Sequence, residues 1–220
     1  MSWDWTYAIS ILPLLAHAAL VTIEAAIGGF VLALVVGLFL ALARRSRSRF
    51  FSYPAVFFVE FVRSTPLLIQ LYFIYFGLPQ FGLSPTPLMT GVVAFGLHFS
   101  TYVSEVYRSG LDGVPRGQWE AATVLNFSAH DRLMLIIIPQ AIPPIVPALG
   151  NYLVLMIKDT PVLAAISVLE LLQTARQLAS QSFRYLEPLT MVGLFFLCLS
   201  VVAGFGIQWL EQRLDTRTTK

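Results

Sequence analysis

The sequence has little charge, little lysine and almost no cysteine. Only 12% of its 220 residues are charged, against about 25% in soluble proteins, while 57% are hydrophobic and the mean hydropathy is +0.75. Because so few polar residues cannot cover a soluble surface, we predict an all-α integral membrane protein. The single cysteine, Cys198, excludes a disulfide framework within the chain.

Motifs for catalysis are also missing. The two lysines, Lys158 and Lys220, do not stand in a glycine-rich phosphate-binding loop, so we predict that this chain does not hold ATP phosphates itself. His17, His98 and His130 are scattered and form no zinc or hydrolase motif, and His98 is expected to be a hydrogen-bonded core residue. We therefore predict a protein that is not an enzyme and has no cofactor or metal of its own.

Hydrophobic runs predict about five membrane spans in one transmembrane domain covering residues 1–220. The run from Ala25 to Ala43 has nineteen uncharged residues, enough to cross a hydrocarbon core of about 30 Å. Gly28, Gly29 and Gly37 in this run are expected to let a neighbouring helix approach closely. The other expected spans are residues 53–76, residues 88–107, a fourth span from about Ile142, and residues 188–210.

The placement of basic residues predicts the orientation. Four arginines between residues 44 and 49 mark the first loop as cytoplasmic, because short cytoplasmic loops are rich in Arg and Lys. Ten basic residues fall on the predicted cytoplasmic side: these four arginines and Arg108, Arg116, Arg132, Arg213, Arg217 and Lys220. Only two, Arg176 and Arg184, fall on the opposite side. The N-terminus is therefore expected outside and the C-terminus inside.

A polar segment of about residues 111–139 falls on the predicted cytoplasmic side. Pro115 suits the first position of a helix, and good helix formers follow it: Gln118, Glu120, Ala121 and Ala122. We expect a short helix here.

A turn and a second short helix are expected next. Asn126 accepts left-handed backbone angles and can end the first helix. Ser128 followed by Asp131 resembles a capping arrangement, and Pro139 is expected to close the second helix.

Charged and hydroxyl residues precede a proline in two of the expected spans. Arg63, Ser64 and Thr65 precede Pro66, and Lys158-Asp159-Thr160 precedes Pro161. Charges inside a membrane are costly unless they are paired or face water, and broken helices expose polar groups to substrate in transporters.

Two explanations for these charges stay open. The two segments, together with Gln70, contact a substrate, and a cation beside an anion would suit a zwitterion. Alternatively, Arg63 pairs with Glu60 and Lys158 with Asp159 for purely structural reasons.

The polar segment carries a resemblance to a known family. Glu120-Ala121-Ala122, Asn126 and the later Ile136-x-Ile138-Pro139 resemble the EAA loop of bacterial importer permeases of the ATP-binding-cassette (ABC) class. That family usually has Gly in place of Asn126 and Leu in place of Ile138.

Further segments resemble the branch of this family that takes up polar amino acids such as histidine, arginine and glutamine. They are residues 61–79, residues 102–110, Gly117-Gln118, and Asn151 followed by Lys158-Asp159-Thr160. That branch commonly has Ser where this chain has Pro161. The sequence also resembles permeases for ectoine and hydroxyectoine, which are zwitterionic compatible solutes.

The resemblance implies the fold and the partners of a type I importer permease in a bacterial cytoplasmic membrane. It implies two copies of an ABC ATPase that uses ATP, a second identical or homologous permease, an extracytoplasmic solute-binding protein and membrane lipid, with no nucleic acid. The residues implied in ATPase coupling are Gln118, Glu120, Ala121, Ala122, Asn126 and Pro139. Those assigned to the substrate path are Lys158, Asp159, Thr160, Arg63, Ser64, Thr65 and Gln70.

Two alternatives from other classes remain at this point. An ion-coupled carrier or channel acting without an ATPase would use Glu60, Arg63, Lys158 and Asp159 as an ion relay. The second alternative is a membrane scaffold that transports nothing. We see no internal hydropathy repeat of the kind that carriers often show, which favours the importer.

Overall fold

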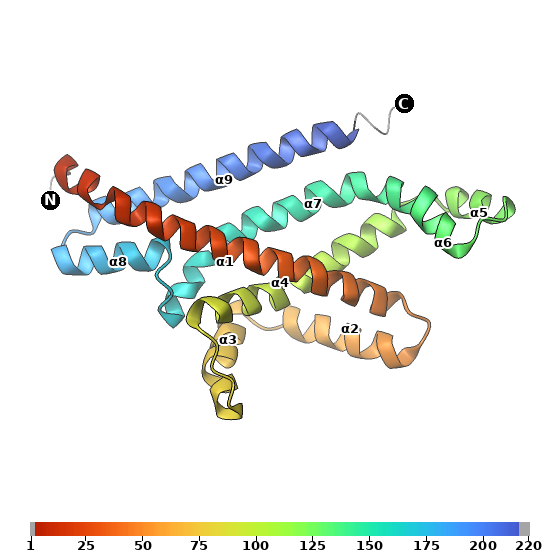
Figure 1. The fold of residues 1–220 in the computed structure, drawn as a ribbon, viewed down its shortest axis with the longest axis horizontal. Helices are drawn as coiled ribbons and strands as arrows, with labels where there is room; N and C mark the ends of the chain where they lie inside the picture. The colour runs from red at the N-terminus through yellow and green to blue at the C-terminus, as the bar shows by residue number, and fades with distance from the viewer. Residues whose placement is uncertain (1–2, 216–220) are drawn as a thin grey trace.

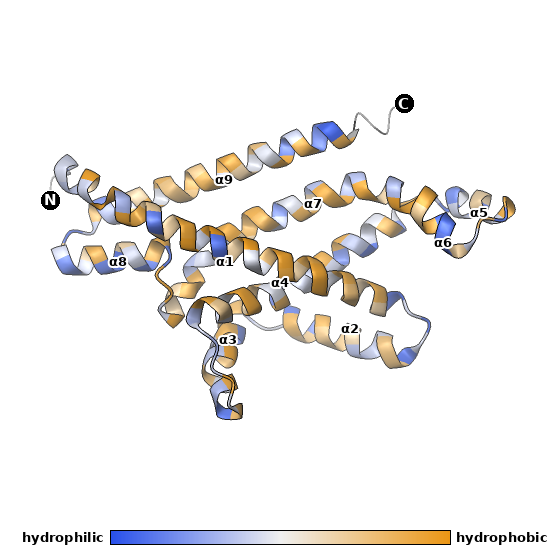
Figure 2. Cartoon of the chain, in the orientation of Figure 1, coloured by the Kyte–Doolittle hydropathy of each residue, from blue (hydrophilic) through white to orange (hydrophobic). Residues whose placement is uncertain are grey.

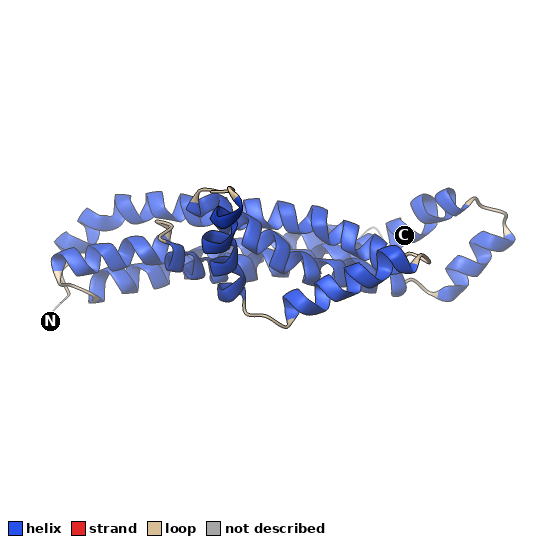
Figure 3. Ribbon diagram, turned by 90° about the horizontal axis from the view of Figure 1, so that it is seen from below, coloured by secondary structure: helices blue, strands red, loops and turns tan. Residues whose placement is uncertain are grey.

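The computed structural model describes residues 3–215, and over this range every regular element is a helix (Figure 3). The α-helices are α1 (Trp5–Arg45), α2 (Arg49–Arg63), α3 (Leu67–Tyr72), α4 (Pro87–Asp112), α5 (Arg116–Val124), α6 (Ala129–Asp131), α7 (Ile138–Asp159), α8 (Leu171–Ser182) and α9 (Leu186–Asp215). The π-helices are η1 (Phe73–Gly77) and η3 (Arg132–Ile137), and the 3-10 helices are η2 (Leu78–Phe81) and η4 (Thr160–Ile166). The tail residues Arg217 and Lys220, which entered the predicted orientation, lie outside the described residues.

The pairing of α1 with α4 forms the centre of the bundle. A Cβ added to Gly29 would lie 2.7 Å from the Cβ of Phe95, and one added to Gly37 would lie 2.9 Å from the carbonyl oxygen of Ser100. The expected close approach at these glycines is therefore confirmed. Phe95, Phe99 and Val103 of α4 are buried in the largest core cluster of the described chain.

The first helix is longer than the expected span. α1 begins at Trp5, twenty residues before Ala25, because Asp4 caps it by accepting hydrogen bonds from the backbone N–H groups of Thr6 and Tyr7 at 2.9 and 3.1 Å. His17 and Glu24, which precede the uncharged run, lie on the exposed side of the same helix.

The elements gather at two ends of an elongated molecule. The loop between α1 and α2, the α5–α6 segment and the end of α9 lie towards one end, and the start of α1 and α8 lie at the other (Figure 1). The loops predicted to share the cytoplasmic side thus share one end of the bundle. The orientation across the membrane remains a prediction.

Three helical stretches are long and apolar enough to cross a membrane: Trp5–Arg45, Ala129–Ile166 and Leu186–Leu214. Counting the bent α2–α3 pair as one span gives up to four. Figure 2 shows apolar colours along most of α1 and α9. The expected third span forms as α4 but is not among these stretches, and it carries His98, Glu105 and Arg108. The count of five spans therefore remains a prediction.

The second expected span is not one continuous helix. α2 ends at Arg63, and the segment 67–81 leaves it at an angle of 106°. This segment, formed by α3, η1 and η2, projects sideways from the bundle (Figure 1). The span expected over 53–76 is thus broken at Pro66, which takes an extended conformation with ψ 138°.

The fourth span starts earlier than Ile142. α6, η3 and α7 follow one another without a gap, and the span begins at Ala129. Three internal prolines, Pro143, Pro144 and Pro147, are accommodated within α7.

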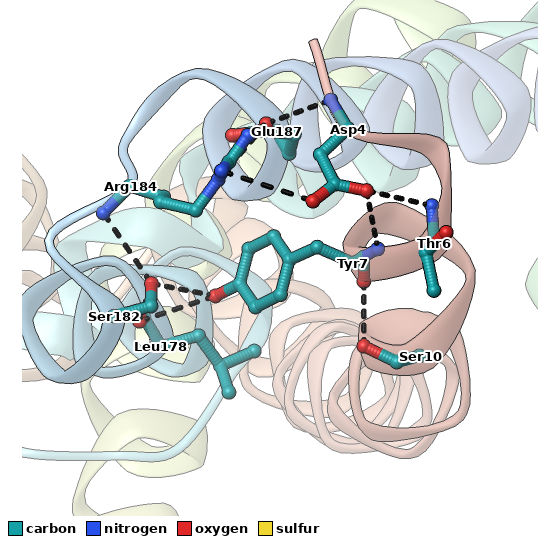
Figure 4. A network of polar contacts seen from close by, with 8 residues as sticks. All are labelled: Asp4, Thr6, Tyr7, Ser10, Leu178, Ser182, Arg184 and Glu187. Carbon is teal, nitrogen blue, oxygen red and sulfur yellow. Dashed lines mark hydrogen bonds and ion pairs between the residues drawn. The ribbon is translucent and has the colours of Figure 1, made fainter. Parts of the chain in front are cut away.

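A polar network ties the start of α1 to the α8–α9 junction (Figure 4). The Arg184 guanidinium pairs with the buried Glu187 carboxylate and lies 3.8 Å from the Asp4 carboxylate. The Tyr7 hydroxyl is 2.8 Å from Ser182 Oγ. The Arg184–Asp4 and Tyr7–Ser182 contacts join residues separated by more than 170 positions in the chain, so they fix this end of the bundle.

Glu170 begins α8 from a fully buried position. Its carboxylate accepts hydrogen bonds from the N–H groups of Leu172 and Gln173 at 2.9 and 2.7 Å, and Thr22 Oγ1 of α1 accepts one from the N–H of Leu171 at 3.2 Å. Burial raises the pKa of the Glu170 carboxyl, and the two N–H groups act in the opposite direction.

Candidate functional site

The segment that contains Glu120 ends its first helix as expected. α5 begins after Pro115, which occupies the cap position rather than the first helical position. Asn126 has φ 58°, and the N–H groups of Asn126 and Phe127 donate to the carbonyl oxygens of Thr123 and Ala122 at 3.0 and 3.1 Å. This is the pattern of a Schellman turn, in which the left-handed residue satisfies the last carbonyls of the helix.

The second helix begins as predicted but does not end at Pro139. Ser128 Oγ accepts a hydrogen bond from the N–H of Asp131 at 3.1 Å and is 2.7 Å from its carboxylate. The chain then continues through η3 into α7, and Pro139 lies in the first turn of α7. The prediction that Pro139 closes a short helix was wrong, because a proline in the first turn has no N–H to leave unpaired.

The α5–α6 segment protrudes beyond the ends of α4 and α7 (Figure 1). On it Glu120, Val124 and Leu125 are exposed, the last two at 80% and 69%, and no hydrogen bond or ion pair within the described chain involves the Glu120 carboxylate. Ala122 is buried on the opposite side. We call Glu120, Val124 and Leu125 the coupling surface.

Two contacts hold this segment on the bundle. Arg132 lies over the Trp119 ring, 5.7 Å from its centroid, and donates to Thr123 Oγ1 at 2.9 Å. Gln118 Oε1 accepts a hydrogen bond from Gln140 of α7 at 3.4 Å. These contacts join α5 to η3 and to the start of α7.

The first proline-containing segment places its cation on an aromatic ring. The Arg63 guanidinium lies 5.0 Å from the centroid of the Tyr102 ring on α4, within the range of a cation–π interaction. No ion pair joins Arg63 to Glu60 in residues 3–215, so the alternative in which these two residues pair is not formed in this structure. Arg63 and Ser64 are exposed, and Thr65 is half-buried.

Gln70 spans the break in the helix. Its Nε2 lies 2.7 Å from the Val62 carbonyl oxygen, 3.0 Å from that of Thr65 and 2.8 Å from Thr65 Oγ1. The same side chain approaches His98 of α4, with Oε1 3.1 Å from Nδ1. The expectation that His98 is hydrogen-bonded is confirmed.

The second proline-containing segment is more enclosed. Lys158 is exposed and Asp159 half-buried, and the described residues contain no ion pair between them. Thr160 is fully buried, and its hydroxyl donates to the Ile157 carbonyl oxygen at 2.8 Å. In this conformation Lys158 and Asp159 are therefore more accessible to a ligand than Thr160.

The fold brings the two proline-containing segments together. α3 contacts η4, and Leu71 shares a core cluster with Leu163 and Ile166. Polar residues from the second and fourth expected spans thus lie around one region beside α4, although no hydrogen bond joins their assigned residues within the described chain.

Sequence reasoning missed an aromatic group in this region. Tyr102 and Tyr152 have ring centroids 5.7 Å apart, and Phe99 lies 6.2 and 6.4 Å from them. These residues come from α4 and α7, so only the packing of the two helices makes them neighbours. Sequence reasoning also missed that Glu105 pairs with Arg44 at 2.5 Å and with Arg108 at 3.3 Å, which anchors the basic end of α1.

The geometry defines a class: a multi-pass helical membrane protein with broken helices in its interior and a protruding helix–turn–helix at one end. Comparison with known families agrees. Residues 33–216 match the family described as the inner membrane component of binding-protein-dependent transport systems. The chain belongs to this family.

Individual relatives are named as permease proteins. A probable amino-acid ABC transporter permease protein of Sinorhizobium fredii is 43% identical over 98% of this chain and 96% of its own length. The arginine transport system permease protein ArtQ of Bacillus subtilis is 31% identical over 98% of this chain and 99% of its own. A solved amino acid ABC transporter with histidines superimposes with a TM-score of 0.91 at 31% identity, covering 97% of this chain and all of its own.

The chain is therefore a membrane-embedded permease of the ABC transporter type, and ATP hydrolysis belongs to a separate subunit. This membership favours the importer over an autonomous carrier or a scaffold. It establishes the family and the fold, whereas the roles of individual residues remain predictions.

Proposed function

We propose that this chain is the transmembrane half of a bacterial importer for polar or zwitterionic amino acids, acting in the cytoplasmic membrane with its N-terminus outside. An extracytoplasmic binding protein delivers the solute, two ATPase subunits act from inside, and a second permease, identical or homologous, completes the path. The printed names of relatives support the substrate class, since they include arginine and amino-acid permeases. Ectoine or hydroxyectoine is a narrower candidate within it.

The protruding coupling surface is the observation that carries the proposal. Val124 and Leu125 offer apolar area and Glu120 offers an unpaired charge, on a helix whose end is fixed by the Asn126 turn. A rigid helix with such a face suits docking into a groove of a partner protein. Gln118 and Pro139 then join this helix to the fourth span, so that movement of the ATPases reaches the region around Asp159.

The substrate path is proposed to run past both proline-containing segments. Arg63 and Lys158 supply positive charge for a carboxylate, and Asp159 supplies negative charge for an ammonium group. The other residues assigned to the path either lie beside it or hold its backbone in shape: Ser64, Thr65, Thr160 and Gln70. The rings of Tyr102 and Tyr152 form an apolar and weakly cation-attracting wall beside Arg63.

Reconstitution with a cognate ATPase and binding protein tests the proposal. In proteoliposomes, Glu120→Lys is expected to lower solute-stimulated ATP hydrolysis and uptake at least about tenfold, because a reversed charge at a docking surface costs several kcal/mol and 1.4 kcal/mol is tenfold in affinity. The matched control is Glu211→Lys, which reverses another exposed carboxylate near the end of α9 and is expected to leave both rates unchanged.

Different outcomes separate the alternatives. Uptake that persists without any ATPase and ignores Glu120→Lys would replace the importer with an autonomous carrier. A panel of arginine, histidine, glutamine and ectoine, each with its binding protein, identifies the solute that stimulates hydrolysis.

A further inference from the structure

Gln70 adds a side-chain donor to backbone carbonyls beside the Pro66 break, where the Val62 carbonyl oxygen also accepts from the Thr65 N–H at 3.3 Å and the Thr65 hydroxyl at 3.2 Å. Pro66 has no N–H, and α2 ends at Arg63, so the last carbonyl groups of α2 lack the donors of a continuing helix. An unpaired carbonyl within a membrane costs several kcal/mol. The side-chain Nε2 of Gln70 lies within hydrogen-bond distance of the Val62 and Thr65 carbonyl oxygens, at 2.7 and 3.0 Å.

This arrangement determines which way the Gln70 amide faces. Backbone carbonyl oxygens only accept hydrogen bonds, so the NH₂ group must point at the break and Oε1 must point away from it. Oε1 lies 3.1 Å from Nδ1 of His98. An amide oxygen also only accepts, so His98 must carry a proton on Nδ1. A directed chain of hydrogen bonds therefore runs from α4 through Gln70 to the end of α2.

The same face of α4 holds Arg63. His98 and Tyr102 are four residues apart on α4, and their rings are 5.5 Å apart. His98 contacts Gln70, and Tyr102 lies beneath the Arg63 guanidinium. One turn of α4 thus fixes both sides of the break, the backbone through Gln70 and the cation through Tyr102.

We propose that Gln70 and His98 are positioning residues: together they hold the α2–α3 break in the shape that keeps Arg63 over Tyr102, and Gln70 is not a ligand for the solute. The amide of Gln70 has its donors and its acceptor occupied within the chain, which leaves little for a ligand. The functional part of this inference rests on the proposed function, because it requires Arg63 to line the solute path.

The transport test uses variants that remove or retain the Gln70–His98 hydrogen bond. In the full importer, Gln70→Met and His98→Phe are each expected to raise the KM for solute uptake about tenfold, since 1.4 kcal/mol of lost positioning is tenfold. His98→Asn keeps a side-chain N–H donor and is expected to recover most of the affinity. Gln177→Met, a change at an exposed glutamine of α8, is the matched control and should leave KM unchanged.

The double variant separates a shared role from two independent ones. If Gln70 and His98 act as a unit, the variant with both Gln70→Met and His98→Phe raises KM no more than either change alone. Additive increases in KM, or a His98→Asn variant as impaired as His98→Phe, would overturn the proposal. A Gln70→Met variant that alters only the maximal rate would overturn it as well.

A second measurement does not depend on transport. The unchanged chain, Gln70→Met, His98→Phe and the double variant, each purified in detergent, are expected to give a non-additive cycle in Tm, with each single change lowering Tm by about 2–4 °C. An additive cycle rejects the Gln70–His98 link even when uptake is intact. A non-additive cycle in a chain that shows no ATP-dependent uptake keeps the link and rejects the importer instead.

Discussion

Pro66 and Pro161 each follow a threonine and a nearby cation, yet the chain turns by 106° at the first and stays helical at the second. Thr160, just before Pro161, keeps φ −55° and ψ −28°, and the chain tightens into η4. Pro66 instead takes ψ 138° and begins a new helix. The residue before a proline normally avoids the helical region, so Thr160 is the exception that needs a cause.

Burial distinguishes the two segments. Thr160, Leu163 and Ile166 are buried, and a Cβ on Gly91 of α4 would lie 2.7 Å from Leu163, so η4 fits a tight space against α4. Pro66 is exposed, whereas Pro161 is half-buried. Where packing encloses a proline, the helix is kept by its neighbours; where it does not, the proline redirects the chain and a side chain must satisfy the carbonyls.

Truncating a buried side chain in the enclosed segment, η4, is expected to lower the free energy of unfolding more than any other change considered for these two segments. Leu163→Ala removes a fully buried side chain and should lower the free energy of unfolding by about 2–5 kcal/mol. Leu68→Ala, at a leucine of α3 that is 38% exposed, should cost less because little cavity is left. Thermal unfolding in detergent compares the two, and equal losses would contradict the difference in packing.

Removing the hydroxyl at each threonine is expected to have a smaller effect. Thr160→Val deletes a buried hydrogen bond to Ile157 and should cost about 0.5–1.5 kcal/mol. Thr65→Val should cost less stability, since Gln70 retains the two carbonyl acceptors, but it should still weaken solute uptake through the position of Arg63. The check is Tm and uptake KM measured on both variants; a larger stability loss at Thr65 would reverse the assignment.

Replacing the prolines themselves is expected to change stability least. Pro161→Ala lies in a backbone that is already helical and should cost about 0.4–1 kcal/mol, mainly by giving the unfolded chain more freedom. Pro66→Ala should be similarly mild for Tm while lowering uptake more, because a restored N–H lets α2 continue towards α3. Uptake that is affected equally by both changes would show that the bend at Pro66 has no special role.

Local signals in the sequence predicted much of the molecule. The apolar runs predicted the long helices. Asn126 and Ser128 predicted the turn between α5 and α6, because left-handed backbone and helix capping depend on residues a few positions apart. Those signals failed at Pro139, where the π-helical turn of η3 leads into α7 instead of a stop. They also failed at Arg63, where Glu60 is close in sequence but Tyr102 is the partner.

The sequence by itself predicted a helical membrane protein with a helix–turn–helix after Pro115, because hydropathy, charge placement and turn residues act locally, and its resemblance to importer permeases implied the family. Only the tertiary structure decided how each proline behaves, what Arg63 contacts and what Gln70 does. Those outcomes depend on α4 and its His98, Tyr102 and Gly91, which lie at least 21 positions along the chain from Gln70 and are brought there only by helix packing.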